Sequence, residues 1–422
     1  MQAPQYARSP ARPPCKRRYN VRCLAALLIF LGTYLVVAMG GVPGLRVDRT
    51  GAAIIGAGLM FAFDVLTIEE AYAAVNYDTI ILLFGMMIVV ANLRLSGFFI
   101  VVGSWVVEHA HRPIWLLLSI CFVSGVFSAF FVNDTMCLVL TPLVLEVTKR
   151  LGRNPVPYLL AVAMSSNVGS AATITGNPQN MLIGSFSGIP YREFTAAMAP
   201  VALAGLVAVA AVIALVYRRE FREESRLALP HRAVHINRVL MWKSLAASAG
   251  MVAFFFAGWP VPKVALVAGA LLLITRRVKP EKVYREIDWS LLVLFIGLFI
   301  VVAGVEKTSF EEDLFAVASR FHLERPAAMT AFAALLSNLV SNVPAVLVFK
   351  PFMPHLGDPR QAWLTLAMAS TLAGNLTLLG SVANLIVVER ARQHVRIGFR
   401  EHAVVGVPLT LLTLALGVWL LG

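Results

Sequence analysis

Long unbroken apolar segments constrain the fold of this chain more than any other feature. Runs such as 23–42, 78–96 and 195–217 carry little charge and show no apolar–polar alternation. Segments of this length cross the hydrocarbon core of a bilayer as helices, and open sheet edges cannot lie in lipid. The sequence therefore predicts an all-α polytopic membrane protein.

The composition and the charge distribution agree with this class. Hydrophobic residues make up 59% of the chain and charged residues only 14%, whereas soluble domains are about half apolar and a quarter charged. The net charge of +13 comes from basic residues that lie mostly in the loops between apolar runs. We therefore assign the positive charge to membrane topology and anionic lipid, and expect no nucleic acid as a partner.

The chain divides into two similar halves. After a basic, Pro-rich tail (1–22), which we expect to be disordered, the first half covers 23–217 and the second 239–421, with a polar loop at 218–238 between them. Three stretches of the first half recur in the second in the same order, and such duplication is typical of secondary transporters. The matching pairs are IVVA (88–91) with IVVA (300–303), FSAFFVNDTMCLVLTPL (127–143) with LSNLVSNVPAVLVFKPF (336–352), and ATITGNPQNMLIGS (172–185) with GNLTLLGSVANLIVVE (374–389).

Polar residues interrupt two apolar stretches in each half. We interpret 114–150 and 326–354 as re-entrant hairpins, and 155–186 and 361–389 as broken helices, because Gly, Pro and amide residues fall midway along each would-be span. Each half then crosses the membrane an odd number of times, so the halves must be inverted relative to one another. The expected architecture is about 10 transmembrane helices plus two hairpins and two broken helices.

The hairpin tips and the helix breaks carry the candidate binding residues. Inverted repeats bring such discontinuous elements together near the bilayer midplane. Amides and hydroxyls can bind a solute there, but they can also hold membrane helices together, and for any single residue the two roles are equally plausible. The set comprises Asn133, Thr135, Thr173, Asn177, Asn180, Ser341, Asn342, Asn375, Thr377, Ser381 and Asn384.

Asp134 is the one carboxylate in this set. An ionised carboxylate costs about 3 kcal/mol at the centre of a membrane helix, so we expect this group to gain and lose a proton near neutral pH. Its counterpart in the second half is Val343, so only the first half carries a candidate proton site. Asp134 is therefore predicted to couple transport to protons, a role compatible with capping the following helix.

Other charged residues are weaker candidates. Asp78 and Asp288 begin equivalent spans, Glu146 is expected to pair with its basic neighbours, and Lys350 could attract an anion or extend to the membrane interface. No metal-binding, nucleotide-binding or hydrolase motif is present. We therefore expect no metal and no cofactor, and a carrier, not an enzyme, that runs on an ion gradient.

The tip and break sequences resemble the ion transporter superfamily, and within it the branch of ArsB-type arsenite permeases and P-protein-like carriers. VNDTMCLVLTPLV and SNVPAVLV resemble the tips of that branch, and ITGNPQNMLIGS and GNLTLLGSVANLIV resemble its broken helices. The resemblance covers roughly residues 50–421. It implies a homodimer in which a hairpin-bearing domain moves against a scaffold, and it is compatible with an accessory ATPase as a partner.

The resemblance also implies a substrate class. Arsenite permeases export As(OH)3 or Sb(OH)3 in exchange for protons, and a pocket of amides and hydroxyls suits such an uncharged solute, whereas a dianion would favour arginine. We therefore expect a proton-coupled arsenite and antimonite exporter of the cell inner membrane. The alternatives are a sodium- or proton-coupled carrier of dicarboxylate- or citrate-like anions, and a cation/proton antiporter.

Overall fold

The computed structural model describes residues 21–41, 44–109, 112–222, 236–307 and 321–422. Residues 1–20 of the predicted tail and 223–235 of the polar loop lie outside this range. The described part consists of helices, with one isolated bridge between Gly41 and Asp48 and no strand. The predicted all-α class is confirmed.

The helices of the first half follow the predicted order of three spans, hairpin, broken helix and last span. The short helices α3, α5 and α11 were not expected from the apolar runs. The elements are α1 (Val21–Met39), α2 (Arg49–Ala62), α3 (Ile68–Ala74), α4 (Tyr77–Leu95), α5 (Phe98–His109), α6 (Pro113–Phe130), α7 (Asn133–Arg150), α8 (Pro155–Ser170), α9 (Pro178–Ser187), α10 (Tyr191–Val216) and α11 (Arg218–Arg222).

The second half repeats the order with shorter hairpin helices and two 3₁₀ turns. Its elements are α12 (Arg238–Phe256), α13 (Val261–Leu273), α14 (Pro280–Tyr284), α15 (Trp289–Glu306), α17 (Pro326–Val340), α18 (Asn342–Phe349), η1 (Lys350–His355), α19 (Pro359–Leu372), η2 (Ala373–Asn375), α20 (Val382–Ala391) and α21 (Phe399–Leu421).

Seven of the described helices are long and apolar enough to cross a membrane: α1, α4, α6, α10, α12, α15 and α21. Three shorter apolar helices, α2, α13 and α17, accompany them. The lengths follow from the sequence, because each long helix carries at most two charged side chains, all within two turns of an end, and is bounded by polar or Pro-containing loops. The chain is a multi-pass integral membrane protein.

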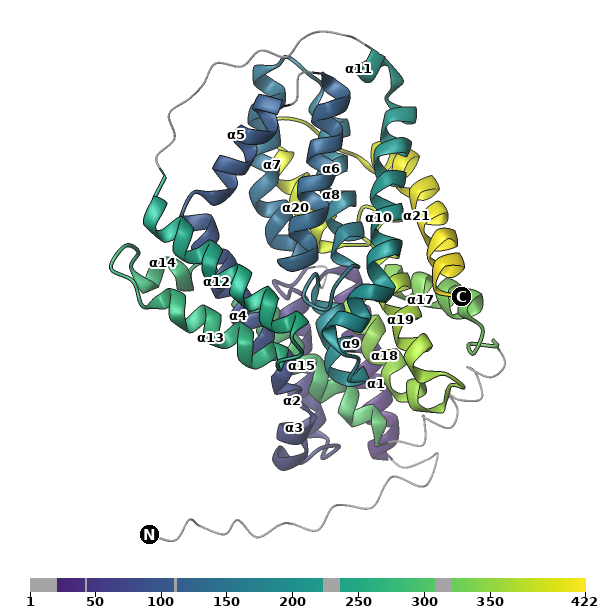
Figure 1. The fold of residues 1–422 in the computed structure, drawn as a ribbon. Coiled ribbons are helices and arrows are strands. Elements are labelled where there is room, and N and C mark those ends of the chain that lie inside the picture. The colour runs from purple at the N-terminus through teal and green to yellow at the C-terminus, as the bar shows by residue number, and fades with distance from the viewer. Residues whose placement is uncertain (1–20, 42–43, 110–111, 223–235, 308–320) are drawn as a thin grey trace.

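The two halves pack reciprocally, as inverted repeats must. Helix α4 packs on α13 while its counterpart α15 packs on α2, and α7 packs on α20 while its counterpart α18 packs on α9. Figure 1 shows the first hairpin (α6–α7) and α20 in the upper half of the molecule, and the second hairpin (α17–α18) and α9 in the lower half. The hairpins therefore enter from opposite sides, and the expected inversion is confirmed.

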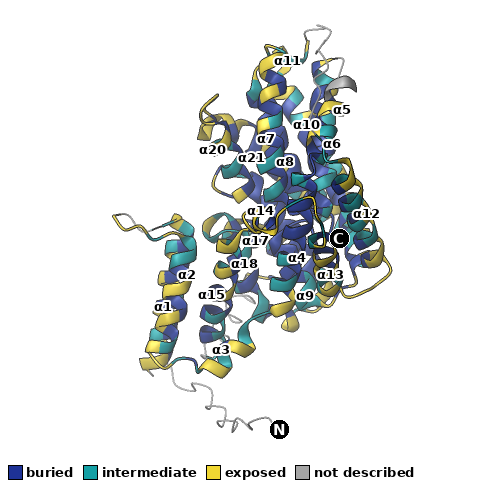
Figure 2. Ribbon diagram, turned by 90° about the vertical axis from the view of Figure 1, so that its left-hand side faces the viewer, coloured by how far each residue is buried: buried dark blue, intermediate teal, exposed yellow. Residues whose placement is uncertain are grey.

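Two bundles can be distinguished by their packing. The hairpins, the broken helices, α10 and α21 form one, here named the hairpin bundle, and α1–α4 with α12–α15 form the other, the flanking bundle. Helix α8 is buried from Val156 to Ser170, and in Figure 2 it lies at the centre of the molecule while α1 exposes much of its surface at the edge. The polar breaks therefore lie in the most enclosed part of the protein.

Candidate functional site: the convergence of tips and breaks

Each broken helix is held open by one asparagine in its second segment. In the first break, Asn180 Nδ2 donates to the carbonyl oxygens of Ser170 (3.2 Å) and Thr173 (2.9 Å). Ser170 is the last residue of α8 and Thr173 lies in the break that follows, so neither carbonyl has a partner within the helix. In the second break, Asn384 Nδ2 donates to the carbonyl oxygens of Gly374 (2.8 Å) and Thr377 (3.1 Å). The two amides occupy equivalent places and make both interruptions stable within a membrane.

The second segment of each broken helix begins at a capped N-terminus. Asn177 Oδ1 accepts a hydrogen bond from the Asn180 N–H at 2.8 Å, and Pro178 occupies the first turn of α9. Ser381 Oγ accepts from the Ala383 N–H at 3.2 Å at the start of α20. Such N-termini carry partial positive charge. The breaks thus offer polarity without a basic side chain.

Threonines of the breaks attach the hairpins. The Thr173 hydroxyl donates to the Ala129 carbonyl of α6, and the Thr377 hydroxyl donates to Asn338 Oδ1 of α17 at 3.0 Å. The Asn133 N–H also donates to the Gly176 carbonyl at 3.0 Å. Gly176 is required there, because a Cβ atom would lie 2.1 Å from the Ser170 carbonyl oxygen.

Asn342, at the second tip, is tied to the second break in the same way. With its amide nitrogen turned to satisfy the surrounding acceptors, Nδ2 donates to the carbonyl oxygens of Ser370 (3.2 Å) and Gly380 (3.3 Å). Gly380 is the repeat counterpart of Gly176. Each hairpin tip is therefore bonded to the break of its own half.

Asn167 joins the two halves at the centre of the site, and sequence reasoning missed it. Its Nδ2 donates to Asn375 Oδ1 (2.8 Å) and Asn384 Oδ1 (3.1 Å). Its Oδ1 accepts from the Ser381 hydroxyl (2.9 Å) and from Asn133 Nδ2 (3.2 Å). The residue lies before the break, within the α8 stretch AVAMSSNVGS, and the only signal was an amide in an otherwise small and apolar span.

Thr371 is the counterpart of Asn167 and makes the reciprocal link. Its hydroxyl oxygen accepts from Asn177 Nδ2 and Gln179 Nε2, both at 3.2 Å. Its hydroxyl also approaches Asn180 Oδ1 at 3.5 Å. Each helix break is thus bonded to the intact helix before the other break, which fixes the two halves against one another.

Four polar groups at the tips are not satisfied by the protein itself. Asn133 Oδ1 is buried without a hydrogen-bond partner. The side chains of Asp134, Thr135 and Ser341 are partly exposed and form no hydrogen bond or ion pair with any described residue. The structure therefore separates the candidate residues into those that support the breaks and those that remain open to a ligand.

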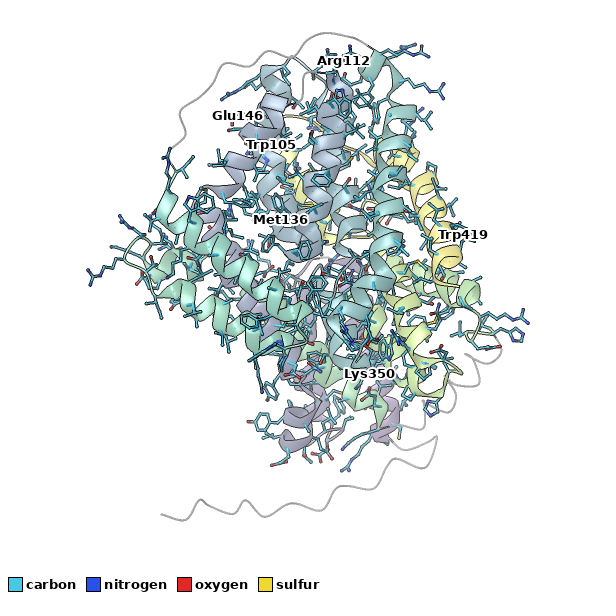
Figure 3. The ribbon with its side chains drawn as sticks, viewed as in Figure 1. Trp105, Arg112, Met136, Glu146, Lys350 and Trp419 are labelled. Atoms are coloured by element: carbon cyan, nitrogen blue, oxygen red, sulfur yellow. The ribbon has the colours of Figure 1, made fainter. Side chains whose placement is uncertain are left out.

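Apart from Asp134, the charged groups discussed above as candidates near the site already have partners. Lys350, in the lower part of Figure 3, lies 2.9 Å from Glu306 of α15 and 5.3 Å from the ring centre of Phe186. Glu146 pairs with Arg150, as expected, and Asp288 caps α15 through the Leu291 N–H at 3.0 Å. No unpaired cation lies among the described tip and break residues. The site is polar, and Asp134 is its one ionisable side chain among the candidates.

Comparisons with known proteins agree with this arrangement. The silicon efflux transporter LSI3 of Oryza sativa subsp. japonica is 30% identical over 462 residues, covering 92% of this chain and 95% of the relative. A Dictyostelium discoideum protein with the name "Putative transporter arsB" is 25% identical over 491 residues, covering 89% of this chain and 87% of the relative. The crystal structure of the YdaH transporter of Alcanivorax borkumensis matches with a TM-score of 0.62 at 15% identity, covering 95% of this chain and 97% of that one, which shows a shared fold.

The family model described as citrate transporter, CitMHS, matches residues 34–373. This range contains both hairpins and the first broken helix, and it ends at the start of the second break. The resemblance to the ion transporter superfamily is confirmed, and the chain is a secondary transporter that belongs to the CitMHS citrate transporter family.

Proposed function

We propose that this protein exports a small uncharged inorganic oxyacid, arsenous acid or its antimony analogue, across the cell inner membrane in exchange for protons. The observation that supports this substrate class is the chemistry of the site. Its open groups are one amide oxygen, two hydroxyls and one carboxyl, and its one nearby lysine is paired with Glu306. A neutral solute with several O–H groups can bond to such acceptors and donors without an opposing charge.

The names of the relatives support the same class. One relative is named a silicon efflux transporter and another bears the name arsB. Silicic acid and arsenous acid are both uncharged polyols at neutral pH, so the two names share one kind of chemistry. We therefore extend the proposed substrate set to silicic acid.

The family description favours a second candidate, a carrier of citrate-like anions coupled to protons or sodium. A multivalent anion would have to be balanced by the partial positive charge of the α9 and α20 N-termini and by coupled cations. The absence of an unpaired arginine or lysine among the described tip and break residues makes this candidate the weaker one.

Transport in reconstituted liposomes tests both candidates. Vesicles with an acidic lumen in neutral buffer should accumulate arsenite against its gradient, measured by mass spectrometry of the trapped element, and lose it when a protonophore collapses the pH difference. Empty vesicles correct for passive leak. Uptake of citrate without uptake of arsenite or silicic acid would overturn the proposal in favour of the anion carrier.

The proton site is proposed to be Asp134. It lies in the first turn of α7, where it is partly exposed and unpaired among the described residues, so a proton or a solute can reach it. Vesicles containing Asp134→Asn should bind arsenite but show no response to the pH difference.

A further inference from the structure

A cavity lies between the two bundles, against the outer side of the first break, where Ile174 forms part of its wall. It has a volume of about 380 Å³ and lies at the start of α4, the α9–α10 connection and the α12–α13 turn. The polar residues proposed to bind the transported solute do not line it. Its size falls within the range of small-molecule sites.

The cavity contains a buried hydroxyl that the protein leaves unpaired. Thr79 is fully buried, lines the cavity, and its Oγ1 has no hydrogen-bond partner among the described residues. Among the buried side-chain atoms without a partner in the described chain, this is the one that lines the cavity, so an occupant of the cavity can supply the partner that the protein does not. The helix start does not need this hydroxyl, since Asn76 Oδ1 already accepts from the Thr79 N–H at 2.8 Å.

A free carboxylate lies beside this hydroxyl. Asp78 lines the cavity, is exposed, and forms no hydrogen bond or ion pair with any residue of the described chain. It is not required for capping α4, which Asn76 performs. Its counterpart on α15 by the IVVA match is Ser290. At the start of α15 the carboxylate is Asp288, the counterpart of Asn76, and it is used to cap that helix. An unpaired carboxylate at the position of Asp78 is therefore not repeated in the second half.

Aromatic rings form much of the remaining wall. Tyr191, Phe255 and Trp259 line the cavity, and the rings of Tyr191 and Phe255 are 5.2 Å apart. The lining contains no lysine, arginine or histidine. Aromatic faces attract cations, and the attraction increases where water is excluded. A carboxylate, aromatic rings and an unpaired hydroxyl together match a small organic ammonium ion.

The walls belong to different bundles. Thr79, Phe255 and Trp259 come from the flanking bundle, whereas Tyr191 and Ser185 come from the hairpin bundle. Asn76 Nδ2 donates to Ser185 Oγ at 2.9 Å across the same boundary. An occupant would therefore contact both bundles at once.

We propose that this cavity is a binding site for a small aromatic or alkyl ammonium ion, held by Asp78, by the faces of Tyr191 and Trp259, and by the Thr79 hydroxyl. The occupant bridges the two bundles. None of the residues proposed to bind the transported solute lines this site, and its test requires no transport assay.

Binding of benzyltrimethylammonium and of benzylamine to the purified full-length protein in nanodiscs tests the proposal, with benzyl alcohol as the uncharged analogue. Both cations should bind more tightly than the alcohol. Asp78→Asn should weaken both cations about tenfold while leaving the alcohol unchanged. Thr79→Val should weaken benzylamine, which can donate a hydrogen bond, more than the quaternary ion, which cannot.

Glu69→Gln is the matched control, because Glu69 is an exposed carboxylate on the preceding helix α3 that does not line the cavity. This variant should bind both cations as the parent protein does. The proposal is overturned if the alcohol binds as tightly as the cations, or if Asp78→Asn leaves cation binding unchanged. Equal weakening by Glu69→Gln would also overturn it, since the effect would then reflect surface charge alone.

Discussion

The two hairpins have the same fold but differ in what their tips leave open. The first tip places Asn133, Asp134 and Thr135 at the start of the 18-residue helix α7, with a carboxylate and a hydroxyl unpaired among the described residues. The second places Asn342 at the start of the 8-residue helix α18, with the amide bonded to the second break. Duplication therefore supplies the architecture, and later divergence confines the ionisable chemistry to one half.

The bases of the hairpins differ as well. The second hairpin is attached to the flanking bundle by the Lys350–Glu306 pair (2.9 Å) and by the Tyr34 hydroxyl, which donates to the Pro344 carbonyl at 3.3 Å. The first hairpin ends in α7, whose Glu146–Arg150 pair lies within one helix. We infer that the second hairpin stays closer to the flanking bundle while the first supplies the titratable group.

Among substitutions that test this difference between the two hairpins, the largest effect on transport is expected at Asp134. Replacing it with Asn keeps the shape and the polar character of the tip but removes the proton carrier. We expect proton-driven arsenite accumulation to fall to the level of empty vesicles. Exchange of labelled for unlabelled arsenite without a gradient should persist, because the hydroxyls and amides remain.

Glu306→Gln is a suitable control for this experiment, since it also removes a carboxylate but at the base of the other hairpin. It should retain the response to the pH difference. A gradient response in Asp134→Asn vesicles equal to that of the parent protein would contradict the one-sided proton site.

The next largest effect is expected at Asn167, compared with its repeat counterpart Thr371. Asn167→Ala removes four hydrogen bonds and leaves buried amides of the second break unpaired. We expect it to reduce the free energy of unfolding by about 3 kcal/mol, since each unsatisfied buried group costs about 1–3 kcal/mol. Thr371→Ala should cost roughly half as much, because its hydroxyl serves fewer partners.

Thermal unfolding of the two variants in detergent measures the difference, and reconstituted transport shows whether the site survives. Ser165→Ala is a matched control on the same helix, because the Ser165 hydroxyl is buried without a described partner. Its removal should be nearly neutral. A Thr371→Ala variant less stable than Asn167→Ala would contradict the central role of Asn167.

The sequence predicted the architecture because the relevant signals are local. Apolar run length specifies a span, and an amide with Gly or Pro in mid-span specifies a break, so Gly176, Asn177 and Asn180 could be recognised without a structure. Each half crosses the membrane an odd number of times, so the repeat also implied that the two halves are inverted. The short helices α3 and α5 were missed because they are too short to produce a membrane-length run.

The division of roles within the site could not be predicted in the same way. Asn180 and Asn384 have the same residue type as Asn133, yet their amides bond to the carbonyls of the broken helices while Asn133 Oδ1 has no partner. Hydrogen-bond partners depend on which helix ends meet, and this is a tertiary property. Asn167 was missed for the same reason, since all four of its partners are distant in sequence.

A smaller effect is expected at the base of the second hairpin. Lys350→Met and Glu306→Gln each break the ion pair between the bundles. Because both side chains are partly exposed, with 37% and 27% of their surface accessible, a double-mutant cycle should give a coupling of no more than about 1 kcal/mol. Thermal unfolding of the single and double variants measures it. Additive effects of the two substitutions would show that the pair does not couple the bundles.

Effects of comparable size, but of opposite sign in the two tips, are expected for glycine substitutions. Ser341 has φ +78° and ψ 159°, a backbone conformation that residues other than glycine rarely adopt. Its counterpart Val132 has φ −50° and ψ 121°. Ser341→Gly should relieve strain and raise the free energy of unfolding by about 1 kcal/mol.

Val132→Gly should lower the free energy of unfolding by about 1 kcal/mol or more. Glycine raises the conformational entropy of the unfolded chain, and the substitution removes a buried side chain from the folded protein. Thermal unfolding of the two variants side by side measures both signs. If both substitutions destabilise the protein, the backbone conformation of Ser341 holds no strain that glycine can relieve, and the expected difference between the two tips is contradicted. A stabilised Ser341→Gly variant that also transports more slowly would instead place the strained tip within the transport cycle, since strain retained at a cost in stability is typical of functional sites.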